Sequence, residues 1–215
     1  MSRPRKPLIS RERAARAALD VIDVQGLHAL SVEQVARRLG VRAPSLYYHF
    51  KDKAELLAEV SRHILTEVEV PQAEGLDWER TLIELCRATR RAILQHPNAA
   101  PLLLEFFPRR LLLSAYDFWT AKCPYPPEMQ LAIVEGVEKL TYGSALFAAA
   151  GRAYGIDPMP DFDPERYPAL SAAVRANPHD EEQLFIETVE TLLAGFRARY
   201  DAKHATTEEH ARVEL

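Results

Sequence analysis

The sequence has no long apolar run, few cysteines and few glycines. A helix that crosses a bilayer needs about 18 or more consecutive apolar residues, and no stretch approaches that length, so we expect no contact with a membrane. The only cysteines, Cys86 and Cys123, show no paired metal-ligand spacing, which favours two reduced thiols over a zinc site or a disulfide framework. The first eight residues lack the apolar core of a signal peptide, so we expect a cytoplasmic protein.

Patterns that carry catalysis are also missing. The histidines are scattered along the chain, and neither a Ser-His-Asp arrangement nor an HExxH zinc motif can be assembled from them. The sequence likewise contains no phosphate-binding loop and no dinucleotide fingerprint. We therefore expect a protein that is not an enzyme, with no catalytic residue, no metal and no cofactor.

Charge is distributed unevenly along the chain. Residues 1–53 contain 11 Lys or Arg against 5 Asp or Glu, whereas the remaining residues contain 16 against 26. A basic end on an acidic body is expected of a protein that presents that end to phosphates. A solvated helix face would give the same counts, so the motifs within the basic segment have to decide.

Residues 31–50 begin with the pattern of a short capped helix. Ser31 and Gln34 have the Ser-x-x-Gln spacing in which each side chain satisfies an amide at a helix start. Gly40 follows the last apolar residue of the periodic run. Because glycine adopts the left-handed conformation that other residues resist, it predicts a sharp turn at the end of this helix.

A second short helix follows the turn. Pro44 is tolerated only in the first turn of a helix, where its missing amide would have no partner, so this helix opens near residue 43 or 44. Leu46 and Phe50 lie four residues apart and can both face inward, which leaves the polar-tipped residues between them outside. The two helices and the tight turn predict a unit that reads DNA.

A first helix precedes this unit. Ser10 can cap it and Gly26 closes it, so that it completes a three-helix domain. Its start carries Arg11 and Arg13, which are candidates for contact with the DNA backbone because a helix N-terminus offers free amides to a phosphate.

A long helix follows the unit. Asp52 and Glu55 repeat the capping-box spacing at its start, and apolar residues carry it to Pro71. The segment from Pro71 to Gly75 breaks the helical pattern and marks the domain boundary. This helix begins at the DNA and ends in the body, so it is the expected mechanical link between them.

The stretch LSVEQVARRLGVRAPSLYYHFKDKAELL, residues 30–57, resembles the DNA-binding region of TetR-family transcriptional regulators. The glycine turn, the proline-opened helix, the Leu-Tyr-x-His-Phe core and the Lys-x-Lys-x-x-Leu-Leu start of the next helix all stand in register. Arg42 is a departure, because the family often has a capping serine there. It adds a cation where bases or phosphates would lie.

The resemblance implies roles for the residues around the second helix. Tyr47, His49 and Lys53 look like phosphate contacts, which orient a protein without reading sequence, and Lys51 stands beside them. One of the two tyrosines could instead be a half-buried aromatic of the small core. Base reading falls to the first turns of the helix. The full set of DNA-binding candidates is Arg42, Ala43, Pro44, Ser45, Tyr47, Tyr48, His49, Lys51 and Lys53.

A single short recognition helix buries too little surface to find one genomic site, so we expect a homodimer on a palindromic double-stranded DNA operator. Long apolar-periodic helices over 128–150 and 180–200 resemble those that form the four-helix dimer interface of TetR-family regulators, and residues 167–197 are similar to the tetracycline-repressor branch. The alternative is that both helices belong to the core of one subunit. The interface candidates are Ile133, Val137, Leu140, Phe185, Val189, Leu192 and Phe196.

The family resemblance also implies an unidentified small-molecule effector. Proline-broken stretches at 97–108 and 124–127 can leave a mouth in a helical bundle, and the body is rich in aromatic residues. Aromatic residues at helical spacing are more often core than ligand contacts, so both interpretations stay open. The ligand-binding candidates are Phe106, Phe107, Tyr116, Phe118, Trp119, Tyr142 and Phe147.

The sequence thus predicts an all-α protein. A helix-turn-helix domain with a basic N-terminal arm covers residues 1–53, and a connecting helix covers 54–71. A helical effector-binding and dimerisation domain covers 72–205, and a polar tail covers 206–215. We expect a repressor that a small molecule releases from its operator, or alternatively a DNA-binding dimer with no ligand response.

Overall fold

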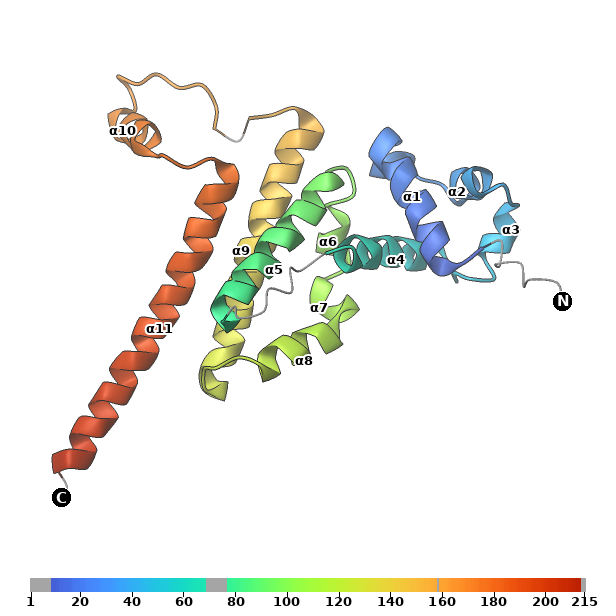
Figure 1. Ribbon diagram of the computed structural model, residues 1–215. Helices are drawn as coiled ribbons and strands as arrows, with labels where there is room; N and C mark the ends of the chain where they lie inside the picture. Colours follow the sequence, from blue (N-terminus) through green and yellow to red (C-terminus); the bar gives the residue numbers. More distant parts are fainter. Residues whose placement is uncertain (1–8, 69–76, 158, 214–215) are drawn as a thin grey trace.

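The computed structural model describes residues 9–68, 77–157 and 159–213, and within these ranges every regular element is a helix (Figure 1). The predicted all-α class is confirmed. The basic arm and the break at 71–75 lie outside the described residues. None of the described helices is both long and apolar enough to span a bilayer.

The N-terminal domain contains α1 (Arg11–Gln25), the short 3-10 helix η1 (Leu27–Ala29), α2 (Val32–Leu39) and α3 (Ala43–Leu46), and the long helix α4 (Lys53–Thr66) completes it. The predicted caps of α1 and α2 are present. Ser31 and Gln34 form the reciprocal capping box, with N to O distances of 3.2 and 2.8 Å. Gly40 ends α2 at φ 70° and ψ 29°, the left-handed conformation that the turn requires.

A small core joins these helices. Alanines of α1 allow it to pack closely along α4, while Leu46 and Phe50 are buried at 1% and 3% exposure, as predicted. The same apolar cluster continues into the body through residues that follow α5, including Leu102 and Leu103. The domain is therefore packed against the body and does not hang from a single linker.

Polar contacts fix this domain junction. The His96 ring lies 2.7 Å from the Asp23 carboxylate, and the Asn98 side chain donates to the Asp23 carbonyl at 3.0 Å. Arg62 of α4 donates to the Leu111 carbonyl at 2.5 Å. The first two contacts hold the end of α1, and the third holds the middle of α4.

The body is a bundle of α5 (Trp78–Gln95), α9 (Pro127–Tyr154) and α11 (Glu181–Val213), with the short helices α6 (Leu102–Glu105), α7 (Pro108–Leu111) and α8 (Leu113–Ala121) on the side of α4. α5 packs along α9, and α9 packs along α11. α10 (Pro168–Ala176) stands apart from the bundle on a loop (Figure 1).

The predicted interface residues lie largely inside this bundle. Ile133, Val137, Phe185 and Val189 are buried at 0 to 6% exposure in one cluster, and Leu140, Leu192 and Phe196 pack against it. For these four residues this matches the alternative that the sequence left open, the core of one subunit, while an interface on other faces of the two helices stays a prediction. The four buried side chains have no surface left for a second subunit.

A buried arginine ties the three long helices together. Arg90 of α5 is 2% exposed, donates to the Ser144 hydroxyl of α9 at 2.9 Å, and lies 2.7 Å from Glu181 at the start of α11. An arginine removed from water destabilises the fold unless it is paired and hydrogen-bonded. This one therefore fixes where α11 begins relative to α5 and α9.

Candidate nucleic-acid interface and ligand cavity

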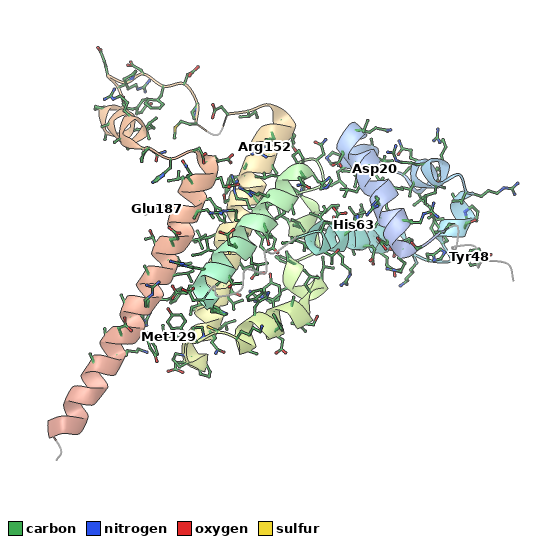
Figure 2. All side chains as sticks on the ribbon, viewed as in Figure 1. Asp20, Tyr48, His63, Met129, Arg152 and Glu187 are labelled. Carbon is green, nitrogen blue, oxygen red and sulfur yellow. The ribbon has the colours of Figure 1, made fainter. Side chains whose placement is uncertain are left out.

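The predicted DNA-binding residues form one continuous segment from the end of the α2 turn to the first residue of α4. Arg42 precedes α3, and the residue is exposed to solvent. Tyr47 and Tyr48 are 53% and 90% exposed, and Tyr48 projects from the end of the domain farthest from the body (Figure 2). The expectation that one of these tyrosines completes the core is therefore wrong.

α3 is shorter than expected. It ends at Leu46, and the chain continues through a turn in which the His49 and Phe50 amides both donate to the Leu46 carbonyl, at 2.9 and 3.0 Å. The buried side chains of Leu46 and Phe50 hold this turn against the core of the N-terminal domain. The segment presents Arg42, Pro44, Tyr47, Tyr48, Lys51 and Lys53 to solvent, while Ala43, Ser45 and His49 are half-buried.

The start of α4 differs from the predicted capping box. Asp52 accepts from the Glu55 amide at 2.8 Å, as the spacing predicts, but Glu55 accepts from the Lys51 amide at 2.6 Å and does not reach Asp52. Lys53 donates to the Leu30 carbonyl at 2.6 Å. The lysine predicted to bind phosphate thus also fixes the chain just before α2, although its ammonium has further donors and stays exposed.

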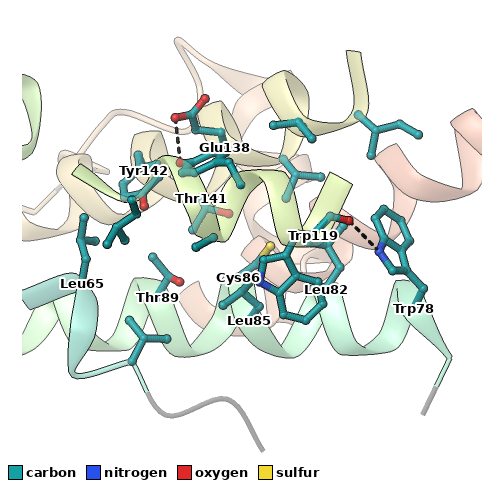
Figure 3. A pocket seen from close by; sticks show the side chains of 17 residues that line it. Leu65, Trp78, Leu82, Leu85, Cys86, Thr89, Trp119, Glu138, Thr141 and Tyr142 are labelled. Atoms are coloured by element: carbon teal, nitrogen blue, oxygen red, sulfur yellow. Dashed lines mark hydrogen bonds between the residues drawn. The ribbon is translucent and has the colours of Figure 1, made fainter. Parts of the chain in front are cut away.

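The second feature is a cavity of about 220 Å³ between α4, α5, α8 and α9 (Figure 3). Its walls are mostly apolar, and both tryptophans of the chain, Trp78 and Trp119, lie at one end. The Trp78 indole donates to the Trp119 carbonyl at 3.4 Å and so joins α5 to α8 there. The lining residues are Leu65, Val68, Trp78, Leu82, Leu85, Cys86, Thr89, Leu112, Ala115, Tyr116, Trp119, Ile133, Val134, Val137, Glu138, Thr141 and Tyr142.

The other end of the cavity is polar. Glu138 accepts from the Tyr116 hydroxyl at 2.9 Å and is also hydrogen-bonded to Arg109, which pairs with Glu135 as well. Burial raises the pKa of the Tyr116 and Tyr142 phenols, so both are protonated donors at neutral pH. The one carboxylate among the described lining residues therefore already has its own cation and a phenol as partners.

Two smaller polar groups, Thr141 and Cys86, lie between the two ends, with Cys86 beside Trp119 (Figure 3). The Thr141 hydroxyl is buried, and its only hydrogen-bonding neighbour among the described residues is the weakly interacting Cys86 thiol. Burial raises the pKa of the Cys86 thiol to about 11, so it is neutral and not a nucleophile at physiological pH. The arrangement suits binding of an uncharged molecule.

Comparison with known proteins identifies the architecture. A family model described as bacterial regulatory proteins of the tetR family matches residues 15–60. The class D tetracycline repressor of Escherichia coli is 27% identical over 204 residues, which cover 90% of this chain and 92% of that protein. By these matches the chain is similar to regulators of the TetR family.

Other relatives agree with this similarity. An HTH-type transcriptional regulator of Saccharopolyspora erythraea is 34% identical over 97 residues, and the chain spans only 41% of its length. Apo ActR from Streptomyces coelicolor has the same fold, with a TM-score of 0.70 at 24% identity over 93% of this chain and 100% of that one. ActR has also been solved in complex with actinorhodin, with a TM-score of 0.67 at 25% identity over 91% of this chain and 99% of that one.

The structure separates the seven aromatic candidates. Tyr116, Trp119 and Tyr142 line the cavity, whereas Phe106 packs against the core shared with the N-terminal domain. Phe107, Phe118 and Phe147 are more than half exposed and lie outside the lining. The face of α8 that meets the cavity repeats at residues 112, 115, 116 and 119, which leaves Phe118 on the other side.

Sequence reasoning missed most of the lining. Leu82, Leu85 and Cys86 of α5 are aliphatic or small residues at core spacing, and nothing distinguishes them from ordinary core in sequence. Glu138 carried a usable signal, because a carboxylate one helical turn from Val134 and from Tyr142 interrupts an otherwise apolar face. A charged residue on such a face needs a buried partner or a cavity.

The acid stability of the DNA-binding end should depend on Glu55. The Lys51 amide and the Arg11 guanidinium hold the pKa of Glu55 below its usual range. A carboxylate with a lowered folded-state pKa stabilises the fold fully above its unfolded pKa and loses that effect as the pH falls through the folded value. Glu55→Gln should therefore lower the thermal midpoint near neutral pH, and the difference from wild type should shrink in acid. A difference that stays constant throughout the acid range contradicts this role.

Proposed function

We propose that this chain is a dimeric transcriptional repressor that binds a palindromic operator and leaves it when a small molecule occupies the cavity. The observation that supports this most directly is the position of α4. Its first residue, Lys53, lies at the DNA-binding segment, and Leu65 near its end lines the cavity. One helix is therefore in contact with both sites.

The DNA-binding segment supplies two kinds of contact. Tyr47, His49, Lys51 and Lys53 hold phosphates, and the first turn of α3 faces base edges in the major groove. Among these residues only Arg42 can bind the two acceptors of a guanine together, which makes it the principal sequence reader.

A second copy of the chain covers the outer faces of α9 and α11. Gly143 and Gly195 have no atom within 4 Å of where a Cβ would lie, whereas the same position at Gly136 lies 3.1 Å from the Leu192 side chain. Glycine within a helix costs about 1 kcal/mol relative to alanine, so an open glycine calls for a close neighbour outside the chain. Phe147, at 80% exposure, shares the α9 face with Gly143.

Coupling passes through the contacts of α4. A molecule in the cavity presses on Leu65, and the Arg62 bond to the Leu111 carbonyl ties the same helix to the segment that leads into α8. α1 packs along α4, so movement of α4 carries the recognition segment with it. By linkage, the cavity ligand must lower DNA affinity by the same factor that DNA lowers ligand affinity.

The lining indicates the chemistry of the effector. Glu138 is paired with Arg109, and no other charged side chain lines the cavity among the described residues, so a charged ligand would lose its hydration without gaining a counter-ion there. The Thr141 hydroxyl provides a buried partner for one polar group. Because ligand pockets typically measure about 300 to 1,000 Å³, this cavity of about 220 Å³ suits a small, uncharged, mostly apolar molecule or must widen for a larger one.

Operator binding tests the central function. Fluorescence anisotropy with DNA that flanks the gene, against random competitor DNA at physiological salt, should show tight binding that survives the competitor. Arg42→Ala should cost about 1 to 3 kcal/mol on the operator and little on random DNA, because it removes a base contact. Lys51→Ala is the matched control and should weaken both DNAs alike. Wild-type binding no tighter than to random DNA would instead favour a non-specific DNA-binding dimer.

Cavity binding is measurable because both tryptophans line it. We expect 1-octanol to change tryptophan fluorescence at lower concentration than octanoate, since the two probes share a chain length and differ in charge. Thr141→Val should weaken octanol binding by about 0.5 to 1.5 kcal/mol, the net value of one neutral hydrogen bond. Thr120→Val, on α8 but outside the lining, should leave it unchanged. Equal affinity for octanol and octanoate would contradict the assignment of an uncharged ligand.

A further inference from the structure

We infer that Arg11 is a positioning residue for operator binding, which holds the turn after α3 in place without touching DNA. The inference rests on the proposed DNA-binding function and concerns a residue that the helix-start pattern would instead assign to a phosphate. It follows from the position of the guanidinium. This group lies between the first two turns of α4 and the turn from Leu46 to Phe50, which we call the recognition turn.

The guanidinium uses nearly all of its donors on the protein itself. One terminal nitrogen donates to the His49 carbonyl at 2.5 Å and to Glu55 at 2.7 Å. The other terminal nitrogen and Nε donate to Glu59 at 3.2 and 3.3 Å. The group also lies over the Phe50 ring, 4.6 Å from its centroid. One side chain thus joins α1 to the recognition turn and to α4.

The recognition turn depends on such a support. α3 has only four residues, and a helix of one turn has little stability of its own. Beyond Leu46 the turn is held by two amide bonds to one carbonyl, by the buried Phe50 and by the Glu55 bond to the Lys51 amide. Arg11 contacts Phe50 and Glu55 and supplies the only donor recorded for the His49 carbonyl among the described residues.

The charge of Arg11 is already compensated before DNA arrives. Two carboxylates, Glu55 and Glu59, contact it, and its side chain is 41% exposed. A phosphate would have to displace one of these carboxylates to bind it. Arg11 therefore contributes to affinity through the geometry of Tyr47, Tyr48 and His49, and it should release no counter-ion of its own.

The salt dependence of binding distinguishes positioning from direct contact. Arg11→Met keeps an apolar stem over Phe50 but loses every donor. We expect at least about tenfold weaker operator binding, as loss of one charge-assisted hydrogen bond would give, with an unchanged slope of log Kd against log salt concentration. A slope smaller by about one would mean that Arg11 binds a phosphate and would overturn the inference.

Arg16 provides a matched control on the same two helices. It joins α1 to α4 through Glu67 at 3.7 Å, one and a half turns farther along α1 from the recognition turn. Arg16→Met should leave operator affinity unchanged, and equal losses for both variants would mean that any α1 to α4 ion pair suffices. The thermal midpoint of each variant is measured first, and the binding titrations are then run well below that temperature, so that every variant is folded. Wild type is titrated in parallel, so a failure of the proposed function itself shows as wild-type binding no tighter than to random DNA.

Glu59→Gln covers the case in which Arg11→Met fails to fold. This change removes a negative charge from the DNA-binding end, so simple electrostatics predicts tighter binding. Positioning predicts the opposite, because Arg11 loses a charged partner and its hold on the His49 carbonyl weakens. Weaker operator binding with an unchanged salt slope supports the inference, and unchanged or tighter binding overturns it.

Discussion

The packing of α4 is the constraint on which the rest of the structure depends. Glu55 in its first turn accepts from the Lys51 amide, the helix packs along α1, and Leu65 in its last turn lines the cavity. A close-packed helix cannot be displaced at one end without moving the elements packed on the other. The short α3 and the half-buried contacts around it are therefore tied to the state of a cavity formed mainly by three other helices.

Much of the DNA-binding end could be predicted from the sequence because its signals are local. The capping box at Ser31, the left-handed Gly40 and the proline in the first turn of α3 each constrain the backbone within three or four residues. The pairing of Glu55 could not be predicted in this way. Its partner Arg11 lies 44 residues away, and only the packing of α1 on α4 brings the two together.

The body was less readable because its helices are apolar on more than one face. The spacing of apolar residues predicted α5, α9 and α11. It did not distinguish the apolar face that packs within the chain from the face that packs on a second copy. Ile133 and Val189 proved to be core, while the open glycines Gly143 and Gly195 mark the surface. The cavity was hidden for the same reason, since a residue such as Leu82 lines it with the spacing of ordinary core.

Coupling through α4 implies that cavity occupancy changes the spacing of the two recognition segments in the dimer, and a distance measurement tests this most directly. Tyr48→Cys places a spin label at an exposed position, and the native Cys86 and Cys123 are buried. Pulsed electron paramagnetic resonance should give a separation near the DNA repeat of about 34 to 36 Å in the free dimer, and a shifted one at an octanol concentration that saturates the tryptophan signal. An identical distance distribution with the cavity empty and filled would contradict the coupling through α4.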